Sequence, residues 1–137
     1  MDKAYLLDTS AIFAYTKGEP GSNDIEHILL LAQKEKCTVY ISFISLTELY
    51  YITWQAKDES SAKELIMLVK SLPVQIVNST EKIALSAGRI KANHRLSVAD
   101  AVIAATAIDK NAVLVHKDPE LKPIAQYVKT VELPFKE

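Results

Sequence analysis

Cysteine and glycine are both scarce in this chain of 137 residues. A single cysteine, Cys37, excludes an internal disulfide and a zinc site built from cysteine ligands. The three glycines, Gly18, Gly21 and Gly88, do not form a glycine-rich turn after the first predicted strand, so a dinucleotide-binding enzyme is poorly supported. The sequence therefore offers neither a disulfide-based nor a dinucleotide-binding framework.

Long hydrophobic runs and an excess of positive charge are also missing. Runs such as 28–32 and 101–105 stop far short of the roughly 18 apolar residues that a membrane span requires. The polar start, with Asp2 and Lys3, does not fit a signal peptide, so we expect a cytoplasmic protein with no membrane association. With a formal net charge of -1, bulk electrostatics will not attract a polyanion, which a local basic patch or a bound cation would have to hold.

The chain does contain a regular alternation of short apolar segments and amphipathic ones. Hydrophobic periodicity predicts strands over 4–7, 38–41, 74–77, 112–115 and 129–133. Helices are predicted directly after residue 8 and over 25–36, 45–56, 65–72, 83–90, 97–109 and 121–127. This alternation predicts one domain over 1–137 with a three-layer α/β/α fold, in which helices cover both faces of a mostly parallel sheet.

Four acidic residues occupy equivalent places in this pattern. Asp8, Glu48 and Asp118 follow predicted strands, and Asp100 lies in the first turn of the most apolar helix. Strand ends of one polarity meet at one edge of a parallel sheet, so we expect these carboxylates to converge. Clustered carboxylates repel one another unless a cation neutralises them, and ligands that are all oxygen suit Mg²⁺ or Mn²⁺.

Each acid also has an alternative role as a helix cap. Asp8 and Asp118 are typical N-cap residues, and the segments 45–48 and 97–100 resemble capping boxes. For any single acid capping is the better explanation, whereas for the set metal binding is favoured. Asp100 weighs most, because a carboxylate among apolar residues is costly to bury unless it is paired or bound to metal.

Four segments resemble the signature segments of the PIN domain family. They read LLDTSA at 6–11, SLTEL at 45–49, SVADAVIAATA at 97–107 and VLVHKD at 113–118. The resemblance covers nearly the whole chain and implies a five-stranded parallel sheet and Mg²⁺- or Mn²⁺-dependent cleavage of single-stranded or structured RNA. Asp8, Glu48, Asp100 and Asp118 match the family's catalytic, metal-holding acids. His116 departs from the pattern, because a Ser or Thr usually stands two residues before the last acid.

For a chain of this size, the resemblance also implies the toxin of a VapBC-type toxin–antitoxin pair, with a protein antitoxin and a homodimeric state. The segment 49–54 is apolar on more than one helix face, so an exposed surface at Tyr50, Tyr51 and Trp54 would dock the antitoxin. Burial of these residues in the core is equally well supported. The alternative function is a PIN-like binding or scaffold module without catalysis, against which the presence of all four acids argues.

Polar and basic neighbours of the acids are secondary candidates. Thr9 and Ser10 would orient a ligand or cap a helix. His116 and Lys117 would contact the scissile phosphate, although we favour a strand end that faces solvent. A second basic group, a candidate for guiding RNA or simply a solvated face, comprises Lys91, His94 and Arg95.

Overall fold

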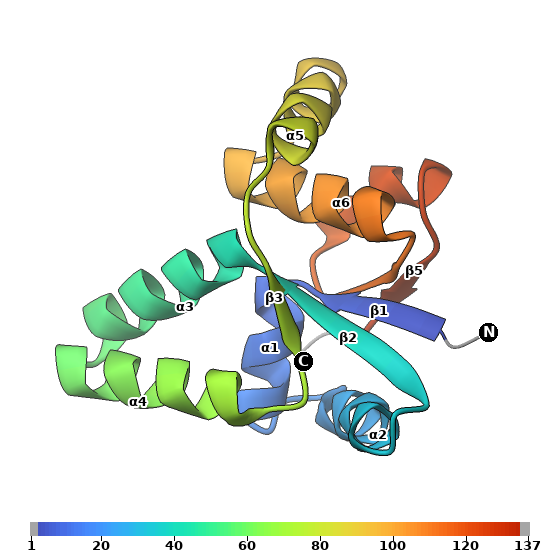
Figure 1. Cartoon of the computed structure of the whole chain (residues 1–137). Coiled ribbons are helices and arrows are strands. Elements are labelled where there is room, and N and C mark those ends of the chain that lie inside the picture. Colours follow the sequence, from blue (N-terminus) through green and yellow to red (C-terminus); the bar gives the residue numbers. More distant parts are fainter. Residues whose placement is uncertain (1–2, 135–137) are drawn as a thin grey trace.

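The computed structural model describes residues 3–134. Figure 1 shows strands surrounded by helices. The strands are β1 (Lys3–Leu7), β2 (Cys37–Ser42), β3 (Gln75–Val77), β4 (Val113–His116) and β5 (Thr130–Glu132). The helices are α1 (Thr9–Thr16), α2 (Ser22–Gln33), α3 (Phe43–Ala56), α4 (Glu59–Ser71), α5 (Glu81–Asn93), α6 (Val98–Lys110) and the 3₁₀-helix η1 (Pro119–Gln126).

The strands form one five-stranded sheet in the order β3-β2-β1-β4-β5. All four pairings are parallel, which confirms the predicted fold class. From β1 the chain builds β2 and β3 on one side, then crosses to β4 and β5 on the other. The order reverses between β1 and β4, which is where open parallel sheets bind ligands.

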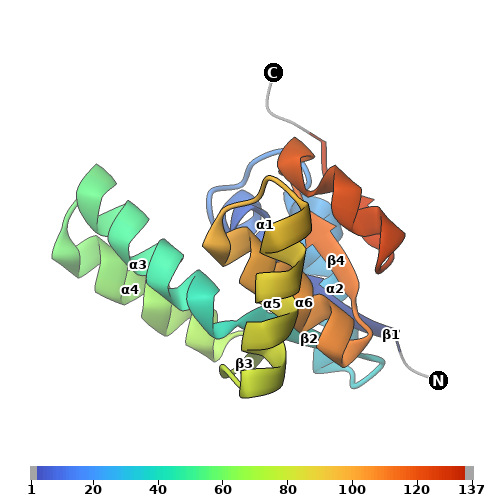
Figure 2. The same cartoon turned by 90° about the horizontal axis from the view of Figure 1, so that it is seen from above.

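Helices cover both faces of the sheet because neighbouring strand residues point in opposite directions. Leu6 and Leu114 are buried against α5, α6 and η1, whereas Leu7 and Val115 are buried with residues of α1 and α2. Figure 2 shows that the α3–α4 pair projects sideways from these layers. No helix within residues 3–134 is long and apolar enough to cross a membrane.

Helix caps explain where the observed helices depart from the predicted bounds. α3 begins at Phe43 because the Ser42 hydroxyl accepts a hydrogen bond from Ile44 N at 3.3 Å. The capping box predicted at 45–48 is therefore wrong, and Ser45 is buried inside α3. α4 begins six residues before the predicted 65, since Asp58 caps a polar first turn by accepting from Ser61 N at 2.7 Å.

Candidate metal centre

Asp8 lies at the end of β1, in the middle of the sheet, and caps α1. Its side chain is 2% exposed and accepts hydrogen bonds from Ala11 N at 2.8 Å and from the Ser10 hydroxyl at 2.7 and 2.9 Å. The Ser10 hydroxyl in turn accepts from Lys117 N at 2.9 Å, which ties the end of β4 to α1. Burial raises the pKa of Asp8 to about 7, although these hydrogen bonds oppose the shift.

Glu48 approaches the same region from α3. Thr9 Oγ1 donates a hydrogen bond of 2.6 Å to Glu48 Oε1 and lies 3.0 Å from the Ser45 hydroxyl oxygen. Thr9 and Ser45 are both buried, so the Ser45 hydroxyl holds the Thr9 hydroxyl in place, and Thr9 orients the carboxylate of Glu48. The N-cap of α1 is Asp8, so the Thr9 hydroxyl does not cap this helix and positions Glu48.

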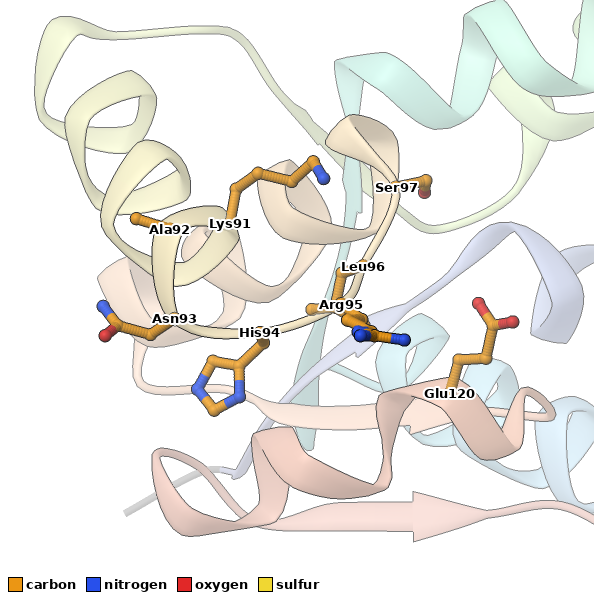
Figure 3. Close-up of a pocket in the computed structure, with 8 residues that line it drawn as sticks. All are labelled: Lys91, Ala92, Asn93, His94, Arg95, Leu96, Ser97 and Glu120. Carbon is orange, nitrogen blue, oxygen red and sulfur yellow. The ribbon is translucent and has the colours of Figure 1, made fainter.

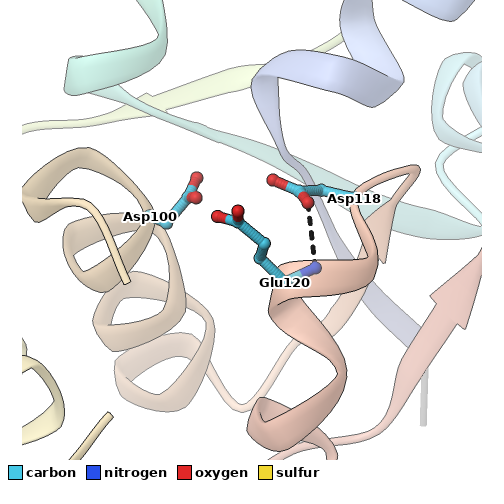
Figure 4. A group of neighbouring side chains, drawn as sticks. All are labelled: Asp100, Asp118 and Glu120. Atoms are coloured by element: carbon cyan, nitrogen blue, oxygen red, sulfur yellow. Dashed lines mark hydrogen bonds between the residues drawn. The ribbon is translucent and has the colours of Figure 1, made fainter. Parts of the chain in front are cut away.

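A group of three acidic side chains lies where the starts of α6 and η1 meet. Asp100, Asp118 and Glu120 each offer a carboxylate oxygen, and these oxygens all lie within 4.8 Å of one another. Figure 4 shows the three side chains pointing toward one another. Asp118 also caps η1 through Glu120 N, with an Oδ1 distance of 2.9 Å. Capping and clustering thus coexist, because a carboxylate has a second oxygen to offer.

Glu120 was not among the predicted site residues. The signal that would have indicated it is its spacing, two residues after Asp118 and directly after Pro119, which favours the first turn of a helix. An acid in that turn lies at the same sheet edge as the acids that follow β1 and β4. Glu120 is exposed, so burial of an acid among apolar residues could not have identified it.

Electrostatic interactions link Asp8 and Glu48 to the group around Asp100. The pKa of Asp100 is raised to about 6, first by burial and then by the charges of Asp118 and Glu48. Asp100 and Asp118 likewise contribute to the raised pKa of Asp8. Asp8, Asp100 and Asp118 therefore interact electrostatically, and Glu48 interacts with Asp100, although within residues 3–134 Asp8 and Glu48 are not part of the tight group around Asp100.

These side chains fit a hard divalent cation. All donors are carboxylate oxygens, and oxygens on opposite sides of one Mg²⁺ are about 4.2 Å apart, because each Mg–O bond is about 2.1 Å. The salt bridges of residues 3–134 join Lys63 to Glu59, Lys82 to Asp109 and Lys117 to Glu19, so none of them neutralises the cluster. The pKa values of Asp8 and Asp100 are raised chiefly by burial, and the charges of neighbouring carboxylates add to both shifts.

The prediction that His116 and Lys117 face solvent is wrong. His116 is buried, its Nδ1 accepts from Asp118 N at 3.2 Å, and burial lowers its pKa, so the ring is neutral. The imidazole thus accepts from the backbone N–H two residues on, as a Ser or Thr hydroxyl is also able to do. The Lys117 ammonium donates to Pro20 O at 2.9 Å and lies 3.7 Å from Glu19 Oε1, so it braces a loop.

The remaining candidates lie on the surface. Arg95 is exposed and lines a pocket of about 570 Å³ next to Glu120 (Figure 3). On α3, Tyr51 and Trp54 are each 45% exposed, whereas Leu49 is fully buried. Tyr50 is partly buried and contacts Trp54 edge to face, with the ring centroids 5.6 Å apart.

Several solved structures are similar to this chain in fold. VapBC2 from Rickettsia felis, solved bound to a promoter DNA fragment, is 25% identical, with a TM-score of 0.76 over 96% of this chain and 99% of that chain. DNA-bound VapBC from Salmonella typhimurium is 21% identical, with a TM-score of 0.77 over 96% of this chain and 98% of that chain. The sarcin-ricin loop cleaving toxin VapC20 from Mycobacterium tuberculosis is 17% identical, with a TM-score of 0.68 over 95% of this chain and 99% of that chain.

Among curated proteins, none matches the chain significantly. The family model of the PIN domain matches residues 5–126, which include all four predicted acids and Glu120. The predicted resemblance is thereby confirmed, and the chain belongs to the PIN domain family.

Proposed function

We propose that this protein is a Mg²⁺- or Mn²⁺-dependent endoribonuclease, the toxin of a VapBC-type toxin–antitoxin pair that acts in the cytoplasm. The observation that carries the proposal is the convergence of carboxylates at the β1–β4 switch point, where no salt bridge among residues 3–134 neutralises them. The similarity to VapBC complexes and to a VapC toxin that cleaves the sarcin-ricin loop supports both the activity and an antitoxin partner. A homodimer follows from the same family resemblance.

In this proposal, the cation is held by Asp100, Asp118 and Glu120, with Asp8 and Glu48 completing its surroundings. When bound, Mg²⁺ or Mn²⁺ supplies activation of a water molecule and neutralisation of the phosphodiester charge. Ser10 and Thr9 hold the carboxylates of Asp8 and Glu48 in fixed orientations through hydrogen bonds of 2.6 to 2.9 Å. No side-chain nucleophile is needed, so the protein contributes binding, orientation and charge.

Titration with Mn²⁺ or Mg²⁺ should raise the melting temperature and start RNA cleavage. At a metal concentration about a hundredfold above Kd, binding stabilises the fold by about 2.7 kcal/mol. For a domain of this size the melting temperature should rise by roughly 10 °C. Thermal melting and cleavage of an end-labelled single-stranded RNA measure the two effects, and EDTA should reverse both. If the metal changes neither the melting temperature nor RNA cleavage, the scaffold alternative is correct instead.

We further propose that the antitoxin docks on the exposed side of α3. Leu46, Tyr50, Tyr51 and Ile66 line a pocket of about 400 Å³ on the projecting α3–α4 pair, and Trp54 lies beside Tyr50. Half-exposed aromatic side chains next to an apolar hollow are typical of residues that dominate binding energy at protein interfaces.

Changing Tyr51 and Trp54 to Ser should weaken antitoxin binding by at least about 30-fold, which corresponds to a hot spot of about 2 kcal/mol. The melting temperature should change little, because both side chains are 45% exposed. The candidate antitoxin is sought as the product of a short open reading frame immediately upstream of the gene, and calorimetry measures its affinity for each variant. Leu85→Ser, at a residue 69% exposed on α5, is the matched control. A loss of folding before a loss of binding would instead place both aromatic side chains in the core.

A further inference from the structure

A pocket lies directly beside the acidic group, between the α5–α6 connection and the start of η1. It measures about 570 Å³ and shares Glu120 with the candidate metal centre. Ser97, which accepts a hydrogen bond from Asp100 N at 3.1 Å, lines one side. Glu120, a member of the acidic group, lines the other. A molecule that fills this pocket therefore lies next to the carboxylates that would hold the cation.

The positive charges of the pocket are available for a ligand. Lys91 and Arg95 line it, both are exposed, and neither takes part in a salt bridge within residues 3–134. Figure 3 shows Arg95 extending from the α5–α6 connection toward the side of the pocket where Glu120 lies. In a chain with a net charge of -1, this is a local positive patch at the edge of an acidic site. Phosphate groups bind to such patches by releasing counterions.

One member of an aromatic pair lines the same pocket: His94 is a lining residue, and Tyr127, which is not, contacts His94 from the end of η1. His94 Nε2 and the Tyr127 hydroxyl oxygen are 2.8 Å apart, and the two rings meet edge to face with their centroids 5.6 Å apart. Tyr127 is 45% exposed, so part of its ring is accessible to a ligand. The contact joins the α5–α6 connection to the end of η1 and holds both rings in place. Proteins that bind single-stranded nucleic acid combine such rings with a positively charged groove.

We propose that this pocket is a subsite for single-stranded RNA that holds the nucleotide next to the scissile phosphate. Arg95 and Lys91 bind the phosphate of that nucleotide, and its base stacks on the ring of Tyr127, which His94 positions. The inference rests on the proposed nuclease function and names a substrate-binding surface for it. It also accounts for how a chain without excess positive charge holds a polyanion beside a cluster of carboxylates.

The charge contribution is tested by Arg95→Gln, with Arg89→Gln as the matched control. Arg89 is an exposed arginine on α5 that does not line the pocket, so the control removes the same charge elsewhere. Binding of a fluorescein-labelled, randomised single-stranded RNA is measured by anisotropy in the non-cleaving Asp100→Asn background. For Arg95→Gln, the slope of log Kd against log salt concentration should fall by about 0.7, the value for one lost contact to a single strand. For Arg89→Gln, the slope and Kd should stay unchanged.

The stacking contribution is tested by Tyr127→Leu and Tyr127→Phe. Loss of one stacked base should raise Kd by about 5- to 150-fold for Tyr127→Leu. Tyr127→Phe keeps the ring and should retain most of the affinity, and its melting temperature shows whether the hydrogen bond to His94 is needed for folding.

In the otherwise wild-type enzyme, Arg95→Gln should raise KM and leave kcat nearly unchanged, because its contact is made equally in the ground state and the transition state.

The outcomes separate this inference from the proposed function. If the unmodified chain cleaves RNA but Arg95→Gln and Tyr127→Leu bind as Arg89→Gln does, the subsite is refuted and the nuclease function stands. If the unmodified chain neither binds nor cleaves single-stranded RNA in the presence of Mn²⁺, both fall together. Weakened binding to a protein partner, with unchanged RNA binding, would also refute the subsite.

Discussion

Replacing Asp100 with asparagine should abolish metal-dependent RNA cleavage and raise the melting temperature of the metal-free protein. The pKa of Asp100 is raised to about 6 by burial and by the charges of Asp118 and Glu48. At neutral pH its carboxylate is ionised, and this charge destabilises the folded, metal-free chain. The full shift corresponds to about 3 kcal/mol. Solvent screening at this half-buried side chain reduces the expected gain on removing the charge to about 1 to 2 kcal/mol.

A helix-capping role for Asp100 predicts the opposite sign. Asp100 N donates to the Ser97 hydroxyl, and the carboxylate lies in the first turn of α6. If its only role were attraction to the positive end of the helix, the Asn variant would lose about 0.3 to 1 kcal/mol of stability and keep its activity. Cleavage should instead fall by at least about a hundredfold, because a residue that holds the cation is removed.

The experiment needs two measurements, melting in EDTA at pH 8 and RNA cleavage with added Mn²⁺. Asp109→Asn is the matched control, because Asp109 lies on the same helix and forms an ion pair with Lys82 at 3.2 Å, away from the cluster. Its stability should fall slightly and its activity should stay unchanged. If the Asp100→Asn protein is less stable and fully active, the assignment of Asp100 to the metal site is wrong.

The fold could be predicted because each layer leaves a periodic signal. Leu6 and Leu7 are both buried, on opposite faces of the sheet, so β1 reads as a continuous apolar segment typical of a strand covered on both sides. Helix starts were predicted less well, because polar first turns such as that of α4 carry no apolar period. The region 121–127 was predicted as a short helix, and the structure contains a 3₁₀-helix that begins at Pro119 and has Pro123 inside it.

The site was predictable to the extent that topology alone brings residues together. Asp8 and Asp118 follow neighbouring parallel strands, so their proximity follows from strand order. The environment of Lys117 could not be predicted, because its hydrogen bond to Pro20 O joins residues 97 positions apart in the sequence. The burial of His116 was missed for a related reason, since β5 pairs with the end of β4 and Leu133 N, directly after β5, donates to His116 O.

Raising the pH from 5 to 8 in EDTA should lower the stability of the wild type relative to Asp8→Asn. Burial raises the folded-state pKa of Asp8 to about 7 from an ordinary value of 3.8, so between these values the folded chain holds a proton that the unfolded chain has released. Stability is therefore highest below about pH 4 and is lost as the pH rises through 7, by about 4 kcal/mol at full shift.

The difference between wild type and Asp8→Asn isolates this effect from other titrating groups. Asparagine keeps an oxygen that can accept from Ala11 N, as Asp8 Oδ1 does at 2.8 Å, so the cap of α1 is preserved. The melting temperatures of the two proteins should be closest below about pH 4, diverge as the pH rises from 4 to 7, and differ by several degrees at pH 8. Because a cation needs the ionised carboxylate, the Kd of the wild type for Mn²⁺ should tighten over the same range, with release of protons that calorimetry in two buffers can count. Parallel stability curves for the two proteins, with Mn²⁺ affinity independent of pH, would show that Asp8 is ionised throughout and does not need the metal to balance its charge.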